Sequence, residues 1–182
     1  MFLELDFNAA ELRTLLALSG KEQPRGDIHE WNAEEIYGGK ITREEAKKRI
    51  FAWLYNPVSK DKASGSAYNR EHILGKYYDG QTVHTCFDRK ISADPHHALN
   101  YIIQSTTSDL LLKRAIKIDK MLETKKSNIA FTLHDSLVID FSVEDKTMIQ
   151  SLIKTFGDTD LGEYVVNVSA GKNFGQMRTL NL

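Results

Sequence analysis

The stretch from Asp94 to Leu122 constrains the fold more than any other part of the sequence. Asp94-Pro95 is a helix cap followed by proline at the first helical position. Apolar residues then recur at helical spacing, so we predict one long helix. They are Leu99, Ile102, Ile103, Leu110, Leu111, Ile116 and Met121. Its uninterrupted apolar runs are far shorter than the ~20 residues that span a bilayer, so we expect it to cover a core.

Short β-prone runs surround this helix in the sequence. Leu3–Asp6 is typical of a strand, and the runs 129–133 and 137–141 flank His134-Asp135-Ser136 as in a hairpin. A last strand is expected at 164–168. Together these elements predict an α+β fold with a small antiparallel sheet backed by helices.

The remaining helices are predicted from capping residues at their starts and from Gly or Pro at their ends. Thr42 stands three residues before Glu45, which is the pattern of a capping box. Helices are expected at 9–18, from Asp27 to Gly38-Gly39, from Thr42 to Asn56-Pro57, and at 142–156 before Gly157. Residues 59–88 show no clear period, so we expect a loop with short structured pieces. The stretch between Ala9 and Asp94 is therefore expected to form a helical insertion.

Charge and cysteine content narrow the class of protein. The 24 Lys and Arg residues nearly balance the 25 Asp and Glu residues, which argues against a wholly basic nucleic-acid coat. The single cysteine, Cys86, excludes an internal disulfide and fits a reducing compartment. The first residues lack the basic start and apolar run of a secretion signal, so a cytoplasmic location is expected.

Two carboxylates are the first candidates for chemistry. Asp6 ends a predicted strand and Asp135 lies at the predicted hairpin turn. Acids at such places are held rigidly while they face solvent, which suits Mg²⁺. Turn aspartates are also commonly local caps, and spacing alone leaves that alternative open.

A stripe on the helix after Thr42 is the second candidate. Arg43, Lys47, Phe51 and Tyr55 recur at every fourth residue and share one face. Two cations followed by two aromatics suit a ligand with phosphates at one end and a flat ring at the other. The same pattern also fits an amphipathic helix with packed aromatics and solvated cations, and the stripe alone does not separate the two.

Two other kinds of site are not supported. The histidines and cysteine at His84, Cys86, His96 and His97 match no standard zinc spacing. The sequence also has no Gly-x-x-x-x-Gly-Lys loop for a nucleotide phosphate.

Six segments resemble family A DNA polymerases, the bacterial DNA polymerase I-like group, and they occur in family order. Residues 6–13, Asp-Phe-Asn-Ala-Ala-Glu-Leu-Arg, resemble motif A. The stripe is similar to motif B in residue types and spacing, and His134-Asp135 resembles motif C. The other three segments are Asp27-Ile28-His29, the run Asn100 to Asp109, and Lys172-Asn173-Phe174-Gly175.

The resemblance implies a domain organisation. Residues 1–20 would be palm, 21–93 a reduced fingers lobe with the motif B helix at 43–55, and 94–182 palm again. The thumb and an exonuclease domain have no counterpart in the sequence. The chain thus resembles the C-terminal palm-and-fingers portion of a polymerase, and a split subunit, a truncated frame (phage genomes are one home) and an expression fragment all fit. The location implied is the cytoplasm of a bacterium or of a bacterial host.

The resemblance also implies an activity, which is DNA synthesis from deoxynucleoside triphosphates (dNTPs) on a primer-template. Asp6, Asp135 and the backbone carbonyl of Phe7 would hold two Mg²⁺ ions. Arg43, Lys47 and His29 would meet the triphosphate, with Lys47 also a proton donor to the leaving group.

Further roles implied by the resemblance concern the sugar, the base and the DNA. Phe51 would lie on the base and sugar, Glu11 would crowd the sugar 2′ position, and Tyr55 would pack against Glu11. The residues expected to contact primer or template are Arg13, Asn100, Gln104 and His134.

Three residues depart from the family pattern. Ser136 stands where a glutamate is usual after His-Asp, Asn56 replaces a glycine, and His96 replaces an arginine. The absence of a thumb favours the alternative function, a catalytically weak DNA- or nucleotide-binding module descended from a polymerase. Without a thumb, we expect weak primer-template binding and association with an upstream polymerase fragment or with a second copy.

Overall fold

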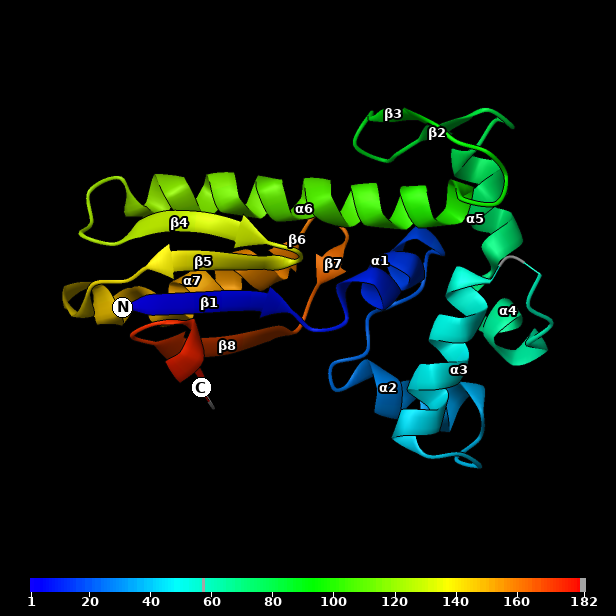
Figure 1. Ribbon diagram of the computed structural model, residues 1–182, viewed down its shortest axis with the longest axis horizontal. Helices are drawn as coiled ribbons and strands as arrows, with labels where there is room; N and C mark the ends of the chain where they lie inside the picture. Colours follow the sequence, from blue (N-terminus) through cyan, green and yellow to red (C-terminus); the bar gives the residue numbers. More distant parts are fainter. Residues whose placement is uncertain (57, 181–182) are drawn as a thin grey trace. The chain divides into compact units, whose positions relative to one another are not determined.

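The computed structural model describes residues 1–56 and 58–180, so the expected helix stop at Pro57 lies outside the described residues. The fold is α+β with a small antiparallel sheet, as predicted (Figure 1). The chain divides into two compact units. Residues 1–10 and 107–182 form the sheet unit, and residues 11–106 form the helical unit. The division falls within the long helix α6 (Ala98–Leu122).

The sheet unit contains a five-stranded sheet with the order β4-β5-β1-β8-β9, in which every pair is antiparallel. The strands are β1 (Phe2–Phe7), β4 (Asn128–Leu133), β5 (Ser136–Asp140), β8 (Val166–Gly171) and β9 (Arg178–Thr179). The predicted first strand and hairpin are therefore present. The last predicted strand begins later, because Tyr164 packs instead against Phe7, with ring centroids 5.3 Å apart.

Alternation along β1 separates the two faces of the sheet. Leu3, Leu5 and Phe7 are buried, whereas Glu4 and Asp6 point to the other face and are half-buried. Helix α7 (Ile149–Gly157) covers the buried face, where Phe156 stacks on Phe7 at 4.2 Å. This apolar packing fixes β1 and so fixes the face that carries the acids.

Three predicted helices differ in detail. The helix predicted from Asp27 to Gly38-Gly39 is a short α-helix, Ile28–Trp31, followed by a π-helical turn, Asn32–Ile36. Helix α6 starts later than Pro95, because the Asp94 carboxylate accepts the N–H groups of His96 and His97 in the preceding turn. The helix predicted at 142–156 is a 3₁₀ segment (Val143–Met148) followed by α7. In the 3₁₀ segment, Asp145 accepts hydrogen bonds from Lys126 and Ser127, which tie it to the start of β4. Two short strands, β6 (Asp158–Thr159) and β7 (Gly162–Glu163), and a 3₁₀ turn (Phe174–Gln176) complete this unit.

The helical unit is built from short helices with side-chain caps. Thr42 and Glu45 form the predicted capping box at the start of α3. Residues 59–88 are more regular than the sequence suggests, because Asp61 and Asn69 cap two helices there. The elements are α1 (Ala10–Leu18), α2 (Ile28–Trp31), a π-helical turn (Asn32–Ile36), α3 (Arg43–Tyr55), α4 (Lys62–Tyr68), α5 (Arg70–Tyr77), β2 (Thr82–His84) and β3 (Lys90–Ser92).

Among the described residues, no helix has both the length and the apolar character needed to cross a membrane.

Candidate active site

Asp6 and Asp135 come together in the sheet unit. Asp6 lies near the end of β1 and pairs in register with Ser136, the first residue of β5. The neighbouring Phe7 N–H donates to the Asp135 carbonyl at 3.3 Å. The β4–β5 turn thus holds Asp135 beside the end of β1, although 129 positions separate the two acids in the sequence.

The turn that carries Asp135 has an unusual backbone. His134, before it, has a φ of 53°, in the left-handed region that only a few per cent of non-glycine residues adopt, with Asn, Asp and His enriched among them. Its own side chain is exposed. A non-glycine residue held in this region costs free energy, and such residues cluster at functional sites.

The electrostatics of this pair favour cation binding. Burial raises the pKa of Asp6 to about 6, Asn167 opposes this with a hydrogen bond of 3.0 Å, and the charges of Asp135 and Glu4 raise it further. Burial is also the main cause that raises the pKa of Asp135. Among the described residues, neither acid has a cationic side chain as an ion-pair partner. The charge of the neighbouring His134 opposes the rise for Asp135, but two crowded carboxylates without an ion-pair partner still form a local negative potential.

The donor set of this pair fits Mg²⁺, which prefers carboxylate oxygens and commonly uses only one or two of them. Within residues 1–56 and 58–180, no cluster of three or more His, Cys, Asp or Glu side chains forms a complete protein cage for a metal. Only a site built from few protein ligands is therefore consistent with this pair.

Glu4 is a neighbour of the pair that the sequence analysis missed. It lies two residues before Asp6 on β1 and shares its face. The Ser136 hydroxyl lies 3.0 Å from one Glu4 carboxylate oxygen, and the Ser169 hydroxyl lies 2.9 Å from the other. Strand alternation could have placed Glu4 beside Asp6, but the serines come from strands that are distant in sequence.

In the helical unit, α3 presents the predicted stripe. Lys47 and Tyr55 are exposed, whereas Arg43 and Phe51 are partly covered. Arg43 forms an ion pair of 2.7 Å with Asp27, the residue that also caps α2. Burial alone would raise the pKa of Asp27, but the hydrogen bonds from Arg43 and from the Glu30 N–H outweigh it and lower that pKa. Asp27 therefore stays ionised and orients the first cation of the stripe.

His29 lies beside this stripe and is only 6% exposed. Its ring lies 5.9 Å from that of Phe51. Burial is the main cause that lowers the pKa of His29; Asp27 opposes this, and the charges of Arg43 and Lys47 add to the lowering. Its Nδ1 atom is buried and has no hydrogen-bond partner among the described residues. A buried polar atom without a partner among the described residues, next to two cations, fits a place where a polar, negatively charged ligand binds.

Glu11 and Tyr55 are joined in the same unit, since the Tyr55 phenol donates to the Glu11 carboxylate. The ring of Phe51 stacks on that of Tyr55 at 5.9 Å. The structure thus groups His29, Arg43, Lys47, Phe51, Tyr55 and Glu11 around one face of α3.

The residues expected to contact DNA lie in different environments. Arg13 is fully buried, and its guanidinium donates to the carbonyls of Pro24 and Gly26 at 2.8 Å. In this conformation Arg13 presents no surface to a phosphate. Asn100 and Gln104 lie one turn apart on α6, half-buried and exposed respectively.

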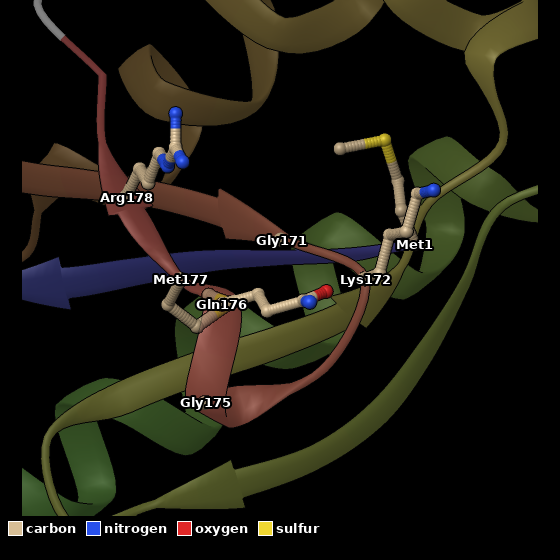
Figure 2. Close-up of a pocket in the computed structure, with 7 residues that line it drawn as sticks. All are labelled: Met1, Gly171, Lys172, Gly175, Gln176, Met177 and Arg178. Atoms are coloured by element: carbon tan, nitrogen blue, oxygen red, sulfur yellow. The ribbon is translucent and has the colours of Figure 1, made fainter.

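A separate pocket of about 510 Å³ opens at the other end of the sheet (Figure 2). Phe2 pairs with Gly171 at that end, whereas Asp6 pairs with Asn167. The pocket is therefore distinct from the carboxylate pair. Its lining residues are Met1, Gly171, Lys172, Gly175, Gln176, Met177 and Arg178.

The fold is similar to one solved polymerase structure in particular. No family model matches the sequence, and no curated protein matches it either. A solved structure with a similar fold is the POL domain of Pol1 from M. smegmatis in complex with DNA primer-template and dNTP. The TM-score is 0.71 at 16% sequence identity. The match covers 94% of this chain but only 39% of that chain, so this chain spans about two-fifths of its length. The fold is thus similar to that of part of a polymerase domain.

Proposed function

We propose that this chain belongs to the family A DNA polymerases and transfers a nucleotidyl group from a dNTP to a primer 3′-hydroxyl. The observation that carries the proposal is that the fold brings Asp6 and Asp135 close together. Both acids are half-buried, lack a cationic partner among the described residues, and lie at one end of a sheet in a fold similar to a polymerase domain. The similarity of fold supports the class of reaction, and the acids supply its chemistry.

Asp6 and Asp135 would hold two Mg²⁺ ions, together with the backbone carbonyl of Phe7. When bound, the metal would acidify the primer hydroxyl and neutralise the triphosphate charge. The primer oxygen then forms a bond to the α-phosphorus, and the bond from that phosphorus to the departing pyrophosphate breaks. His134 would lie by the primer terminus.

The helical unit would hold the nucleotide. Arg43, Lys47 and His29 would bind the triphosphate, and the buried Nδ1 of His29 supports a polar ligand at this place. Lys47 would donate a proton to the pyrophosphate as it leaves. Phe51 would lie on the base and sugar.

Selection of the sugar and contacts with DNA would come from the remaining residues. The Glu11 carboxylate, held by Tyr55, would crowd a ribose 2′-hydroxyl. Asn100 and Gln104 would contact the minor groove of the primer-template, where acceptor positions vary little among correct pairs. Arg13 would act on the primer strand only if its loop contacts were released.

Primer extension with Mg²⁺ and all four dNTPs tests the reaction. We expect extension by the wild-type chain, in the presence of an upstream polymerase fragment if the chain alone binds DNA too weakly. Asp6→Asn and Asp135→Asn should each abolish it, while Asp119→Asn, an exposed acid on α6, should not. Extension that survives in both site variants would overturn the proposal.

Nucleotide binding tests the helical unit without requiring turnover. Lys47→Ala should weaken dNTP binding at least tenfold by fluorescence titration, and Lys48→Ala, its exposed neighbour on α3, should not. If nucleotide and primer-template bind but no extension occurs under any condition, the chain is the binding module considered as the alternative.

A further inference from the structure

The acidic residues on this face of the sheet do not end with Asp6 and Asp135. Glu4 shares that face with Asp6, and the register places it between Val138 of β5 and Ser169 of β8. Among the described residues no Lys or Arg forms an ion pair with Glu4. Three carboxylates, two on β1 and one in the β4–β5 turn, are therefore grouped here without an ion pair to a Lys or Arg of the described residues.

Glu4 is held in place from both sides. Its Oε1 atom lies 3.0 Å from the hydroxyl of Ser136, and its Oε2 atom lies 2.9 Å from the hydroxyl of Ser169. The two serines belong to the strands that flank β1, so the carboxylate is fixed across the centre of the sheet. The Ser136 hydroxyl also lies 2.9 Å from the carbonyl of Leu133, at the base of the turn that carries Asp135.

This group of acids destabilises the folded chain unless a bound ligand offsets the repulsion. Like charges on neighbouring positions of a sheet repel and destabilise it. Serine hydroxyls orient a carboxylate but do not neutralise it, so the negative potential remains. A divalent cation at Asp6 and Asp135 would offset the repulsion of all three acids.

We propose that Glu4 is a positioning residue for the cation site, raising its affinity by a fixed negative charge, and that Ser136 and Ser169 hold this charge in place. Both Glu4 oxygens lie within hydrogen-bond distance of serine hydroxyls, and Glu4, Asp6 and Asp135 form no three-ligand cluster among the described residues, so we assign Glu4 a role that acts through Asp6 and Asp135. The inference rests on the proposed function, because it takes Asp6 and Asp135 as the ligands.

The test measures cation binding by the full chain, with Mn²⁺ as the probe and the electron paramagnetic resonance signal of free Mn²⁺ as the readout. Glu4→Gln keeps the shape and one acceptor but removes the charge, and we expect about tenfold weaker binding. Ser169→Ala keeps the charge but loosens it, and about two- to threefold weaker binding is expected. Glu123→Gln, at an exposed acid in the turn that follows α6, removes one charge elsewhere in the same unit and should leave affinity unchanged.

Two further measurements separate a charge effect from a structural one. The tenfold difference for Glu4→Gln should shrink when ionic strength rises from about 0.05 M to about 0.5 M, because salt screens charges. In EDTA, Glu4→Gln should unfold at a higher denaturant concentration than wild type, since it relieves repulsion. If Glu4 serves only to form hydrogen bonds, Glu4→Gln should instead unfold at a lower denaturant concentration than wild type.

The outcomes distinguish this inference from the function on which it rests. Unchanged Mn²⁺ affinity in folded Glu4→Gln, or in Ser169→Ala if the first variant does not fold, overturns the role of Glu4. If Asp6→Asn and Asp135→Asn lose Mn²⁺ binding in the same series, the proposed cation site survives that result. If those two variants bind Mn²⁺ as wild type does, the cation site and the proposed function both fail.

Discussion

The phenol of Tyr55, at the end of α3, donates a hydrogen bond to the carboxylate of Glu11, at the start of α1. Burial is the main cause that raises the pKa of Tyr55, and the hydrogen bond and charge of Glu11 add to it. The phenol therefore stays protonated and remains a donor throughout the neutral range. An acid and an aromatic residue 44 positions apart in sequence thus form one fixed group.

The first prediction concerns the choice of sugar. If the Glu11 carboxylate crowds the 2′ position, Glu11→Ala should raise ribonucleotide incorporation relative to deoxynucleotide incorporation at least tenfold. Tyr55→Phe should act in the same direction but more weakly, because it frees the carboxylate without removing it. The ratio of the two incorporation rates is the measurement, with Glu35→Ala as an exposed control. An unchanged ratio in Glu11→Ala would exclude the steric role.

The second prediction separates the two tasks of Asp27. Asp27 caps α2 and also pairs with Arg43, 16 residues later in the sequence. Asp27→Ala loses both interactions and should destabilise the helical unit by about 1 kcal/mol. Asp27→Asn keeps a capping side chain and removes only the charge, so its stability should change by less than half as much. Both variants leave Arg43 less oriented, so both should weaken dNTP binding in a fluorescence titration. Unchanged dNTP affinity in Asp27→Asn would show that the ion pair does not orient Arg43 for the ligand.

Local signals in the sequence account for much of the fold. The capping box at Thr42, the run before Asp6 and the hairpin around His134 each depend on a few neighbouring residues, and the structure has all three elements. The long helix α6 was predicted from its apolar period for the same reason. The sequence prediction missed two helices because it relied on an apolar period. Residues 59–88 have caps at Asp61 and Asn69 but no apolar period, so their two helices were not predicted.

The candidate site could be predicted from the sequence only in part. Which acids and cations matter could be proposed from residue types and order, but their partners depend on contacts distant in sequence. The serines that hold Glu4 come from β5 and β8, and no local pattern connects them to β1. The burial of Arg13 likewise depends on the loop at Pro24 and Gly26 folding over it. Sequence alone therefore identified chemical groups better than it identified their surroundings.

The third prediction concerns the backbone of His134. Its φ of 53° suits Asn and Gly better than His. His134→Gly and His134→Asn should therefore keep or raise stability, by up to about 1 kcal/mol, whereas His134→Val should lower it because β-branched residues disfavour this region. Thermal unfolding measures all three. Primer extension should nevertheless fall in His134→Asn if the side chain serves the primer terminus. Full activity in that variant would leave His134 with a role in the turn alone.

The fourth prediction concerns Asp6 and pH. Burial raises its pKa from 3.8 to about 6 in the folded chain, so between these values the folded state holds a proton that the unfolded state has lost. The folded state is therefore stabilised at the acidic end of this window, and that stability is lost as pH rises through about 6. Above about pH 6, the ionised Asp6 carboxylate lowers the free energy of unfolding, because folding buries its charge.

Asp6→Asn removes this titratable group, so the variant should show directly how much the buried charge destabilises the folded state. In EDTA, the variant should be more stable than wild type at pH 7.5 by roughly 1 kcal/mol, after allowance for the partial exposure of the carboxylate. The difference should shrink towards zero near pH 4, where Asp6 is protonated in the folded wild type. Denaturant unfolding at both pH values measures it, with Asp119→Asn as the exposed control. A variant that is less stable than wild type at pH 7.5 would mean that the Asn167 hydrogen bond outweighs burial and repulsion, and that Asp6 is a structural residue rather than a charge held ready for a cation.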